Sequence, residues 1–270
     1  MGFFDTTRPL VFAHRGGCAL GPENTLAAFD RGARTGADGL ELDVRLSADG
    51  VAVVHHDPTL DRTTDAIGTV ASKTAAELAR LDAACRFGAD EGFPWRGQGF
   101  GVPTLAAVLK RYPNARIIAE MKDDVREMGE AVARDIRAAG AVDRVCVAGF
   151  GANALRGARE TLPDLTTSAH QAEVRAALYR SWLHWPVRPT QYRGYQIPER
   201  AGRIRVVSPR FVRHAHEADL RVQVWTVDTS NDMERLLGWG VDALISNRPD
   251  LAVAVRDRWV AGRGERRAVG

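Results

Sequence analysis

The sequence is poor in cysteine and has no long apolar segment. Only three of its 270 residues are cysteine, and the wide spacing of Cys18, Cys85 and Cys146 lacks the paired pattern of a zinc site. No window approaches the roughly 18 uninterrupted apolar residues of a membrane span, and the stretch before His14 is too short for a signal peptide. These absences predict a cytoplasmic protein with free thiols and without stable membrane insertion.

Lysine is also almost absent. Lys73, Lys110 and Lys122 are the only lysines, and arginine supplies the other basic side chains of a chain whose formal net charge is +3. The arginines are spread along the chain and form no basic stripe, so we expect no nucleic-acid partner. A small anionic substrate suits this charge. Cys18 lies close to His14, but the sequence assigns it no base, and we interpret it as a bystander and not as a nucleophile.

Short β-branched runs alternate with helical stretches along the whole chain. This alternation, without internal repeats or low-complexity tracts, is typical of βα units around a parallel sheet. One such helical stretch begins near Asn24, a candidate N-cap, and ends at Gly36. The predicted strands are Leu10–Ala13, Gly39–Leu46, Val51–His56, Arg116–Met121, Arg144–Ala148, Leu165–Ala169, Tyr195–Pro198, Val222–Val227 and Ala243–Ser246.

Nine predicted strands are one more than an eight-stranded barrel needs. Only residues 47–50 separate the second run from the third, and a parallel crossover needs about a dozen residues or more, so these two runs must form an antiparallel hairpin. The remaining eight predict an α/β fold, a (β/α)8 TIM barrel, with a doubly wound open sheet as the alternative. We expect one domain over 1–270, a small insertion after strand two at 57–103, and a flexible tail at 261–270.

Carboxylates gather near the predicted carboxyl ends of the strands, where TIM barrels place their catalytic groups. Glu41 and Asp43 share one face of their strand, and Glu120 and Lys122 share a face of the next barrel strand. Buried side by side, such carboxylates repel unless a cation offsets the cost, and oxygen ligands favour Mg²⁺ or Ca²⁺. Pairing with arginine is the alternative.

The hairpin predicts which of two adjacent histidines reaches this place. With 47–50 as the loop, Leu46 opposes Val51 and Glu41 opposes His56. This register places His56 beside the carboxylates and turns His55 away, while a slip of one residue would exchange the two histidines.

His14, at the end of the first strand, completes a set suited to phosphoester hydrolysis. Cations, among them Arg15 and Lys122, would balance the charge on the transferring phosphoryl group. One histidine would take a proton from the nucleophile, and the other would give one to the leaving oxygen. Gly16 and Gly17 would let the backbone turn closely past a ligand.

Ordered motifs along nearly the whole chain resemble the glycerophosphodiester phosphodiesterases of the phospholipase-C-like phosphodiesterase superfamily. The motifs are "HRGG...PENTLAAF", "GADGLELDVRLSADGVAVVHHDPTLDRTT", "VPTLAAVL", "IIAEMK", "VWTVD" and "WGVDALISNRPD". The resemblance implies a barrel with a small insertion and an enzyme of lipid and glycerol metabolism. Its reaction would hydrolyse glycerophosphodiesters to glycerol 3-phosphate and an alcohol.

The resemblance also implies roles for individual residues. The implied acid/base pair is His14 and His56, the implied ligands of one divalent cation are Glu41, Asp43 and Glu120, the implied phosphate contacts are Arg15 and Lys122, and Trp225 would lie near the substrate glycerol. Two positions depart from the common pattern. Asp228 stands where asparagine is frequent, and Asn247 stands where aspartate is frequent.

Other functions on the same fold stay open at this point. They are a lysophospholipase D-type hydrolase, a catalytically silent phosphate-binding protein, and a metal-dependent barrel acting on a non-phosphorylated carbonyl substrate. The aromatic segment 181–196, rich in proline, is either a packed surface loop or a wall that shapes the alcohol side of the substrate or meets lipid.

Several side chains keep a structural alternative. Trp225 could be plain core, and Asp57 could cap a turn or orient a catalytic group. Asp61 and Arg62 could form a surface pair, and Glu23 could act as a brace.

Overall fold

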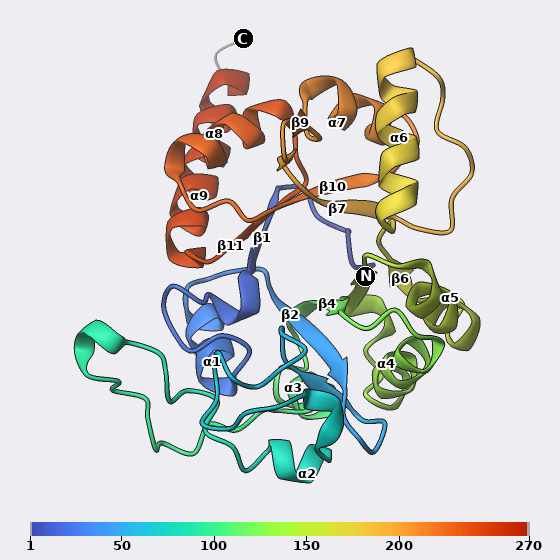
Figure 1. The fold of residues 1–270 in the computed structure, drawn as a ribbon. Coiled ribbons are helices and arrows are strands. Elements are labelled where there is room, and N and C mark those ends of the chain that lie inside the picture. Colours follow the sequence, from blue (N-terminus) through green and yellow to red (C-terminus); the bar gives the residue numbers. More distant parts are fainter. Residues whose placement is uncertain (1, 269–270) are drawn as a thin grey trace.

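Eight parallel strands form the barrel at the centre of the molecule (Figure 1). The computed structural model describes the backbone of residues 2–268 and the side chains of residues 2–262. The barrel strands are β1 (Leu10–Ala13), β2 (Gly39–Leu46), β4 (Arg116–Met121), β5 (Val145–Gly149), β6 (Thr166–Thr167), β7 (Gly194–Pro198), β10 (Arg221–Trp225) and β11 (Ala243–Ser246). They are ordered β6-β5-β4-β2-β1-β11-β10-β7, and a parallel bridge between Ser168 and Gly194 nearly closes the ring. The predicted TIM barrel is confirmed.

One helix follows each barrel strand and packs on its outer side (Figure 1). Side-chain hydroxyl groups cap several helix starts, as at Thr25, Thr104 and Ser208. The expected cap at Asn24 is wrong, because Asn24 has a φ of 58° and Thr25 accepts the hydrogen bond from the Ala28 amide. The helices are α1 (Leu26–Arg34), α3 (Leu105–Arg111), α4 (Arg126–Ala138), α5 (Ala152–Thr161), α6 (Gln171–Leu183), α7 (Pro209–His216), α8 (Ser230–Trp239) and α9 (Pro249–Ala268).

The hairpin after β2 forms as predicted, but its register differs by one residue. β3 (Ala52–Val54) pairs antiparallel with β2, and Leu46 lies opposite Ala52 instead of Val51. The Ser47 hydroxyl and amide both bond to Val51 in the turn, so the loop takes one residue more than expected. The predicted pairing of Glu41 with His56 is therefore wrong.

Some predicted strands are longer than the observed ones. The sixth is cut to Thr166–Thr167, because the Ser168 amide still bonds to β5 while the Ala169 amide turns to the Gly194 carbonyl of β7. The aromatic segment 181–196 begins inside α6 and ends in β7, with an irregular loop between them. A small hairpin that the sequence did not predict, β8 (Arg200–Ala201) with β9 (Ile204–Arg205), follows β7.

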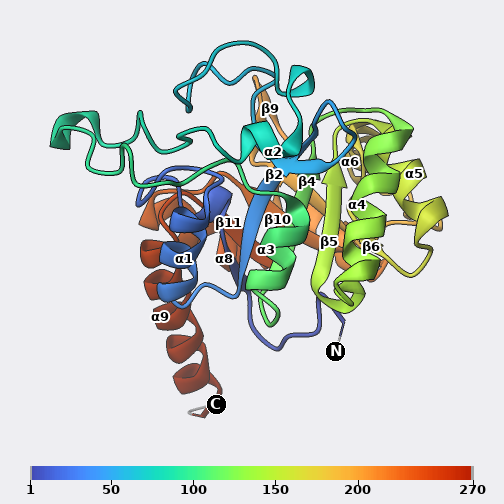
Figure 2. The ribbon, with the colours of Figure 1, turned by 90° about the horizontal axis from the view of Figure 1, so that it is seen from below.

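The predicted insertion at 57–103 contains α2 (Ala75–Leu78) and short 3₁₀ turns. Its apolar side chains pack on Val53 of β3, so it is anchored to the barrel hairpin. In Figure 2 it lies at the end of the barrel toward which the strands point, together with β9, whereas both chain ends lie at the opposite end. The 3₁₀ turns Val70–Ser72 and Ala89–Glu91 belong to the insertion. The 3₁₀ turns His14–Gly16 and Val142–Arg144 lie elsewhere in the chain.

The expected flexible tail at 261–270 overlaps α9, which continues to Ala268, while residues 269 and 270 lie outside the described residues. Within residues 2–268, none of the helices combines the length and the apolar character that crossing a membrane requires.

Alternation along the strands separates the interior of the barrel from its helical coat. Leu10 and Phe12 of β1 and Ile118 of β4 belong to a buried cluster inside the barrel. Leu40 and Leu42 of β2 face the other way and pack against the surrounding helices. The inward face of β2 is therefore the face that carries its carboxylates.

Candidate active site

The first strand ends in a tight turn that aims two functional groups at the barrel mouth. Arg15, Gly16 and Gly17 have φ angles of 50°, 86° and 88°. A Cβ atom on Gly16 would lie 2.8 Å from the Ala28 backbone, and one on Gly17 would lie 2.9 Å from the side chain of Pro249. Both glycines are therefore required by the turn, as the sequence predicts.

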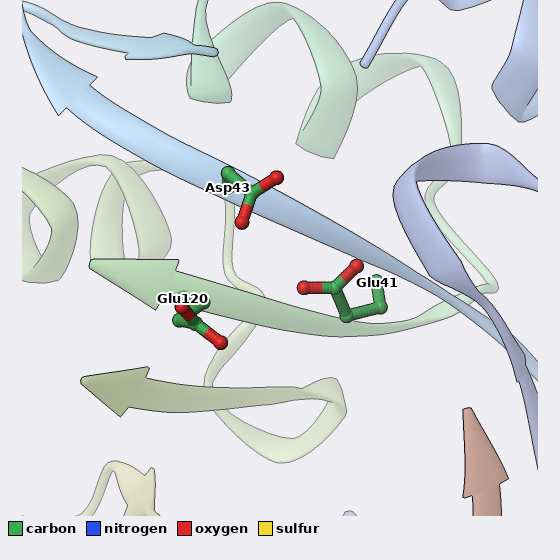
Figure 3. A group of neighbouring side chains, drawn as sticks. All are labelled: Glu41, Asp43 and Glu120. Carbon is green, nitrogen blue, oxygen red and sulfur yellow. The ribbon is translucent and has the colours of Figure 1, made fainter. Parts of the chain in front are cut away.

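Three carboxylates converge inside the barrel mouth (Figure 3). Glu41 and Asp43 point inward from β2 and Glu120 from β4, and one oxygen of each lies within 4.8 Å of the others. Asp43 and Glu120 occupy paired positions of the two strands. The expectation that these three residues come together is met, and such an oxygen set suits a hard divalent cation.

The charges around these carboxylates are unequally compensated. Asp43 lies 3.1 Å from Arg15 Nε and 2.9 Å from Lys122 Nζ, and these cations lower its pKa although burial opposes its ionisation. Burial and the neighbouring Asp43 carboxylate raise the pKa of Glu41 well above its usual value. Burial likewise raises the pKa of Glu120, which Lys122 contacts.

Glu41 is the carboxylate that most needs further positive charge. Its Oε2 atom accepts the Arg15 amide hydrogen at 2.9 Å, and its side chain is almost fully buried. Within the described residues, Glu41 forms no ion pair with an arginine or lysine side chain. Pairing with arginine, the alternative to a metal, therefore accounts for the charge of Asp43 but not for that of Glu41. A divalent cation fits the oxygen ligands that these carboxylates offer.

Both predicted histidines line one cavity of about 160 Å³. His14 Nδ1 lies 2.6 Å from Asn247 Oδ1, and burial lowers the pKa of His14. His56 Nδ1 lies 2.6 Å from Asp57 Oδ1. The cavity is lined by His14, Arg15, Glu41, His56, Glu120, Lys122, Phe150, Gln196, Trp225, Thr226 and Ile245. Of the predicted site residues, only Asp43 lies behind this lining, in contact with Arg15 and Lys122.

His56 lines the cavity as predicted, but strand pairing does not bring it there. Pairing of β3 with β2 ends at Val54, and the His55 amide donates a last hydrogen bond to the Asp43 carbonyl. The chain then bends, so His56 enters the site from a turn. His55 is buried and its Nε2 lies 3.0 Å from the Thr59 carbonyl, consistent with the structural position predicted for it.

A chain of ion pairs leads from Arg15 to His56. Glu23 contacts Arg15 at 3.0 Å and Arg62 at 2.7 Å, so it is a brace, as the sequence suggests. Arg62 also binds Asp57, whose other oxygen faces His56. Asp57 therefore orients the His56 ring, and the suggested surface pair of Arg62 with Asp61 is wrong.

Sequence reasoning missed several residues of the site. Asn24 donates from Nδ2 to Asp43 at 2.8 Å, and the only signal was its place in the first motif. Phe150 and Gln196 line the cavity without any motif that marks them. Asp228 and Asn247, the two departures from the family pattern, contact one another at 2.7 Å.

An apolar cavity of about 310 Å³ adjoins the polar one. The two share Glu120, Phe150, Gln196 and Trp225, and the Trp225 ring packs edge-on against Phe150. Trp225 is half-buried at the boundary between the cavities and packs against the barrel interior, so it is both a core contact and a lining residue.

Comparisons with known proteins agree with this geometry. A glycerophosphodiester phosphodiesterase of Caldanaerobacter subterraneus subsp. tengcongensis is 32% identical over 91% of this chain and 97% of its own length. The crystal structure of a glycerophosphodiester phosphodiesterase from Agrobacterium tumefaciens superposes with a TM-score of 0.75 at 30% identity, covering 92% of this chain and 99% of that one.

A phosphodiesterase of Oleispira antarctica, solved in complex with the product sn-glycerol-3-phosphate, superposes with a TM-score of 0.71 at 25% identity and covers 93% of this chain and 97% of that one. Residues 14–251 match the family model described as the glycerophosphoryl diester phosphodiesterase family. The match spans the barrel from the turn after β1 to the start of α9. The chain therefore belongs to the glycerophosphoryl diester phosphodiesterase family.

Proposed function

We propose that this chain hydrolyses glycerophosphodiesters to glycerol 3-phosphate and an alcohol. The observation that carries the proposal is the polar cavity of about 160 Å³, in which two histidines, two carboxylates and two cationic side chains face one space. Membership of the family and the product bound to the Oleispira relative support the same substrate class.

In this proposal Glu41, Asp43 and Glu120 hold one divalent cation, Mg²⁺ or Ca²⁺. The bound cation would supply positive charge against the phosphate oxygens. Arg15 and Lys122, which line the same cavity, would add two further positive charges toward the phosphate. Trp225 would contact the glycerol part of the substrate at the cavity boundary.

The two histidines have different partners, which suggests different tasks. His14 faces the neutral amide of Asn247, and burial lowers its pKa, so its free Nε2 atom is suited to take a proton from the nucleophile. His56 Nδ1 faces the Asp57 carboxylate, which holds the ring in one orientation. We assign to His56 the proton that the leaving alcohol oxygen receives when its bond to phosphorus breaks, and the net reaction consumes one water.

The test is an assay of metal-free and metal-reconstituted protein against a panel of glycerophosphodiesters. Glycerophosphocholine, glycerophosphoethanolamine and glycerophosphoinositol should each release glycerol 3-phosphate after addition of Mg²⁺ or Ca²⁺, and inorganic phosphate should compete with the substrate. Full activity after chelation would contradict the metal. Phosphate binding without turnover of any diester would favour a silent binding protein, and turnover that phosphate does not inhibit would favour the carbonyl alternative.

The apolar cavity favours a second candidate function, a lysophospholipase D-type reaction on diesters that carry an acyl chain. The cavity is lined by apolar side chains, among them Ala169, Leu178, Ile197 and Ile204. A polar head group would make no apolar contact with them, whereas an acyl chain would. Each methylene buried there should raise kcat/KM by about fourfold. The measurement is choline release from glycerophosphocholine and from its butanoyl, hexanoyl and octanoyl derivatives.

One pair of variants sharpens this test. Ile204→Glu places a charge in the apolar cavity and should abolish the gain with chain length, while turnover of glycerophosphocholine stays unchanged. Ile67→Glu is the matched control, because Ile67 is an exposed isoleucine of the insertion that lines neither cavity. Equal kcat/KM for all chain lengths in the wild-type protein would exclude this second candidate.

A further inference from the structure

Three consecutive strand ends are linked by hydrogen bonds that lead to the ring of His14. Asp228 follows β10, Asn247 follows β11 and His14 follows β1, and these strands are neighbours in the barrel. Asn247 Nδ2 donates to Asp228 Oδ2 at 2.7 Å, and Asn247 Oδ1 lies 2.6 Å from His14 Nδ1. The path thus runs from a carboxylate through an amide to an imidazole.

The Asp228 carboxylate determines the direction of every bond in this path. Its oxygens also accept from the Asn247 backbone amide at 2.8 Å and from the Ser246 hydroxyl at 3.0 Å, so the carboxylate is held in place. An ionised carboxylate only accepts hydrogen bonds, so the Asn247 amide must turn its NH₂ group toward Asp228. The amide oxygen of Asn247 then faces His14.

An oxygen at this position forces the proton of a neutral His14 ring onto Nδ1. The contact of Cys18 agrees with an oxygen at this position, because the Cys18 thiol also donates to Asn247 Oδ1, at 2.7 Å. Burial raises the pKa of Cys18 to about 11, so the thiol remains a donor. With Nδ1 protonated, the lone pair of a neutral His14 is on Nε2, 3.8 Å from Glu41 Oε2 at the cavity.

We propose that Asp228 and Asn247 are positioning residues that hold His14 in the tautomer and orientation in which Nε2 can take a proton. This inference rests on the proposed role of His14 as the proton acceptor. Neither residue lines the polar cavity, so neither acts by touching the substrate. The two positions act as one unit, because Asp228 binds the NH₂ group of the Asn247 amide while His14 and Cys18 face its oxygen.

Replacing one oxygen of Asp228 should therefore reverse the direction of the hydrogen bonds in this path. In Asp228→Asn, an NH₂ group replaces the oxygen that faces Asn247. The Asn247 amide should then turn by half a rotation, so that its oxygen accepts from the new NH₂ group. The NH₂ group of Asn247 would then point at His14 Nδ1, which would have to accept, and the ring proton would move to Nε2. A neutral His14 in that state offers no lone pair to the nucleophile.

The test compares wild type with Asp228→Asn, Asn247→Asp and the double variant in which the two residues are exchanged. Each single change should lower kcat on the order of a hundredfold with KM altered less than about twofold. In Asn247→Asp two carboxylates would face one another. The exchanged pair should restore most of kcat, because an amide at position 228 can donate to a carboxylate at position 247, and that carboxylate can accept from His14 Nδ1.

A second measurement does not depend on turnover. Nitrogen NMR of ring-labelled histidine should show the Nδ1–H tautomer for His14 in the wild-type protein and the Nε2–H tautomer in Asp228→Asn. Asp219→Asn is the matched control, because the exposed Asp219 pairs with Arg221 at the start of β10, the opposite end of that strand from Asp228, and should change neither readout.

Three results would overturn the proposal: an Nε2–H tautomer in the wild-type protein, an unchanged kcat in Asp228→Asn, or an exchanged pair no better than the worse single variant. If no glycerophosphodiester is turned over at all, the proposed function fails, and the tautomer measurement still tests the path.

Discussion

Two arcs of the barrel rim lie at two adjoining cavities and carry opposite chemistry. The charged arc consists of His14, Arg15, Glu41, Asp43, Glu120 and Lys122 at the ends of β1, β2 and β4. The apolar arc consists of Ala148, Gly149, Ala169, Ile197 and Pro198 at the ends of β5, β6 and β7. The boundary falls between neighbouring strands, since Glu120 is paired with Ala148 on one side of the ring and Trp225 with Pro198 on the other.

The difference teaches what a buried charge requires. Asp43 is only 1% exposed, and Arg15, Lys122 and Asn24 all contact its carboxylate. The Asp43 charge is tolerated because these groups compensate it, whereas Glu41 has no such cationic side chain beside it among the described residues. The apolar arc needs no such network, because its side chains lose nothing when they leave water. The charged arc thus depends on a network of polar partners, and the apolar arc depends on packing alone.

The largest expected effect comes from breaking the charged arc at its histidines. His14→Ala or His56→Ala should lower kcat for glycerophosphocholine by about 10²- to 10⁴-fold, because each removes one proton-transfer group. His184→Ala, at an exposed position after α6, is the control and should keep the wild-type kcat. Unchanged turnover in either of the first two variants would refute the assigned pair.

The next largest effect is expected on stability, at the contact between α4 and α5, the helices that follow the last strand of the charged arc and the first strand of the apolar arc. In Gly129→Ala the new methyl group of α4 would overlap the Ala154 carbonyl of α5, so unfolding free energy should fall by about 1–3 kcal/mol. The kcat of the folded fraction should not change. Chemical denaturation measures the effect.

The control for that change is Gly238→Ala in α8, where the added methyl group meets no atom of the described residues within 4 Å. Alanine is a better helix former than glycine, so this variant should gain stability. Equal free energies of unfolding for the two variants would contradict the packing argument.

A smaller effect is expected at the edge of the charged arc. Arg62→Ala removes the cation that links Asp57 to Glu23, so the His56 ring should lose part of its orientation. Since Arg62 is half exposed, we expect kcat to fall by less than about tenfold. Steady-state kinetics of Arg62→Ala and of Arg80→Ala, an exposed arginine of the same insertion, would separate this from a general charge effect; equal values would contradict it.

The smallest effect concerns the opposite end of the barrel, away from both arcs. A hydrogen bond with Asp242 raises the pKa of His216 above its usual 6.5, at a distance of 2.8 Å. The stabilisation is fully present below the unfolded pKa and is lost as pH rises through the higher folded pKa. Tm should therefore fall between about pH 5.5 and pH 8 more in wild type than in His216→Gln. Parallel Tm curves for the two proteins would contradict the pairing.

Sequence reasoning predicted the fold well because its signals are local and repeated. Four predicted strands, among them Leu10–Ala13 and Arg116–Met121, match the structure residue for residue. Short loops impose an antiparallel return, so the hairpin was also predictable. The errors fall where tertiary partners decide: the turn at Ser47 shifts the register, and the Gly194 carbonyl draws Ala169 out of β6.

The candidate site shows the same division. Alternation along β2 predicts that Glu41 and Asp43 share a face, and the structure brings Glu120 to them. The register argument for His56 is wrong although His56 lies in the cavity, because the bend after Val54 places it there.

The amino-acid sequence by itself determined the order of elements, the inward face of each strand and the types of side chain at the strand ends, because these follow from local periodicity. Only the tertiary structure decided which residues become partners across the barrel. The path from Asp228 through Asn247 to His14 joins residues more than 200 positions apart in the chain, as does the contact of Cys18 with Asn247. Pairing of β1 with β11, the first and last barrel strands, places them within hydrogen-bonding distance.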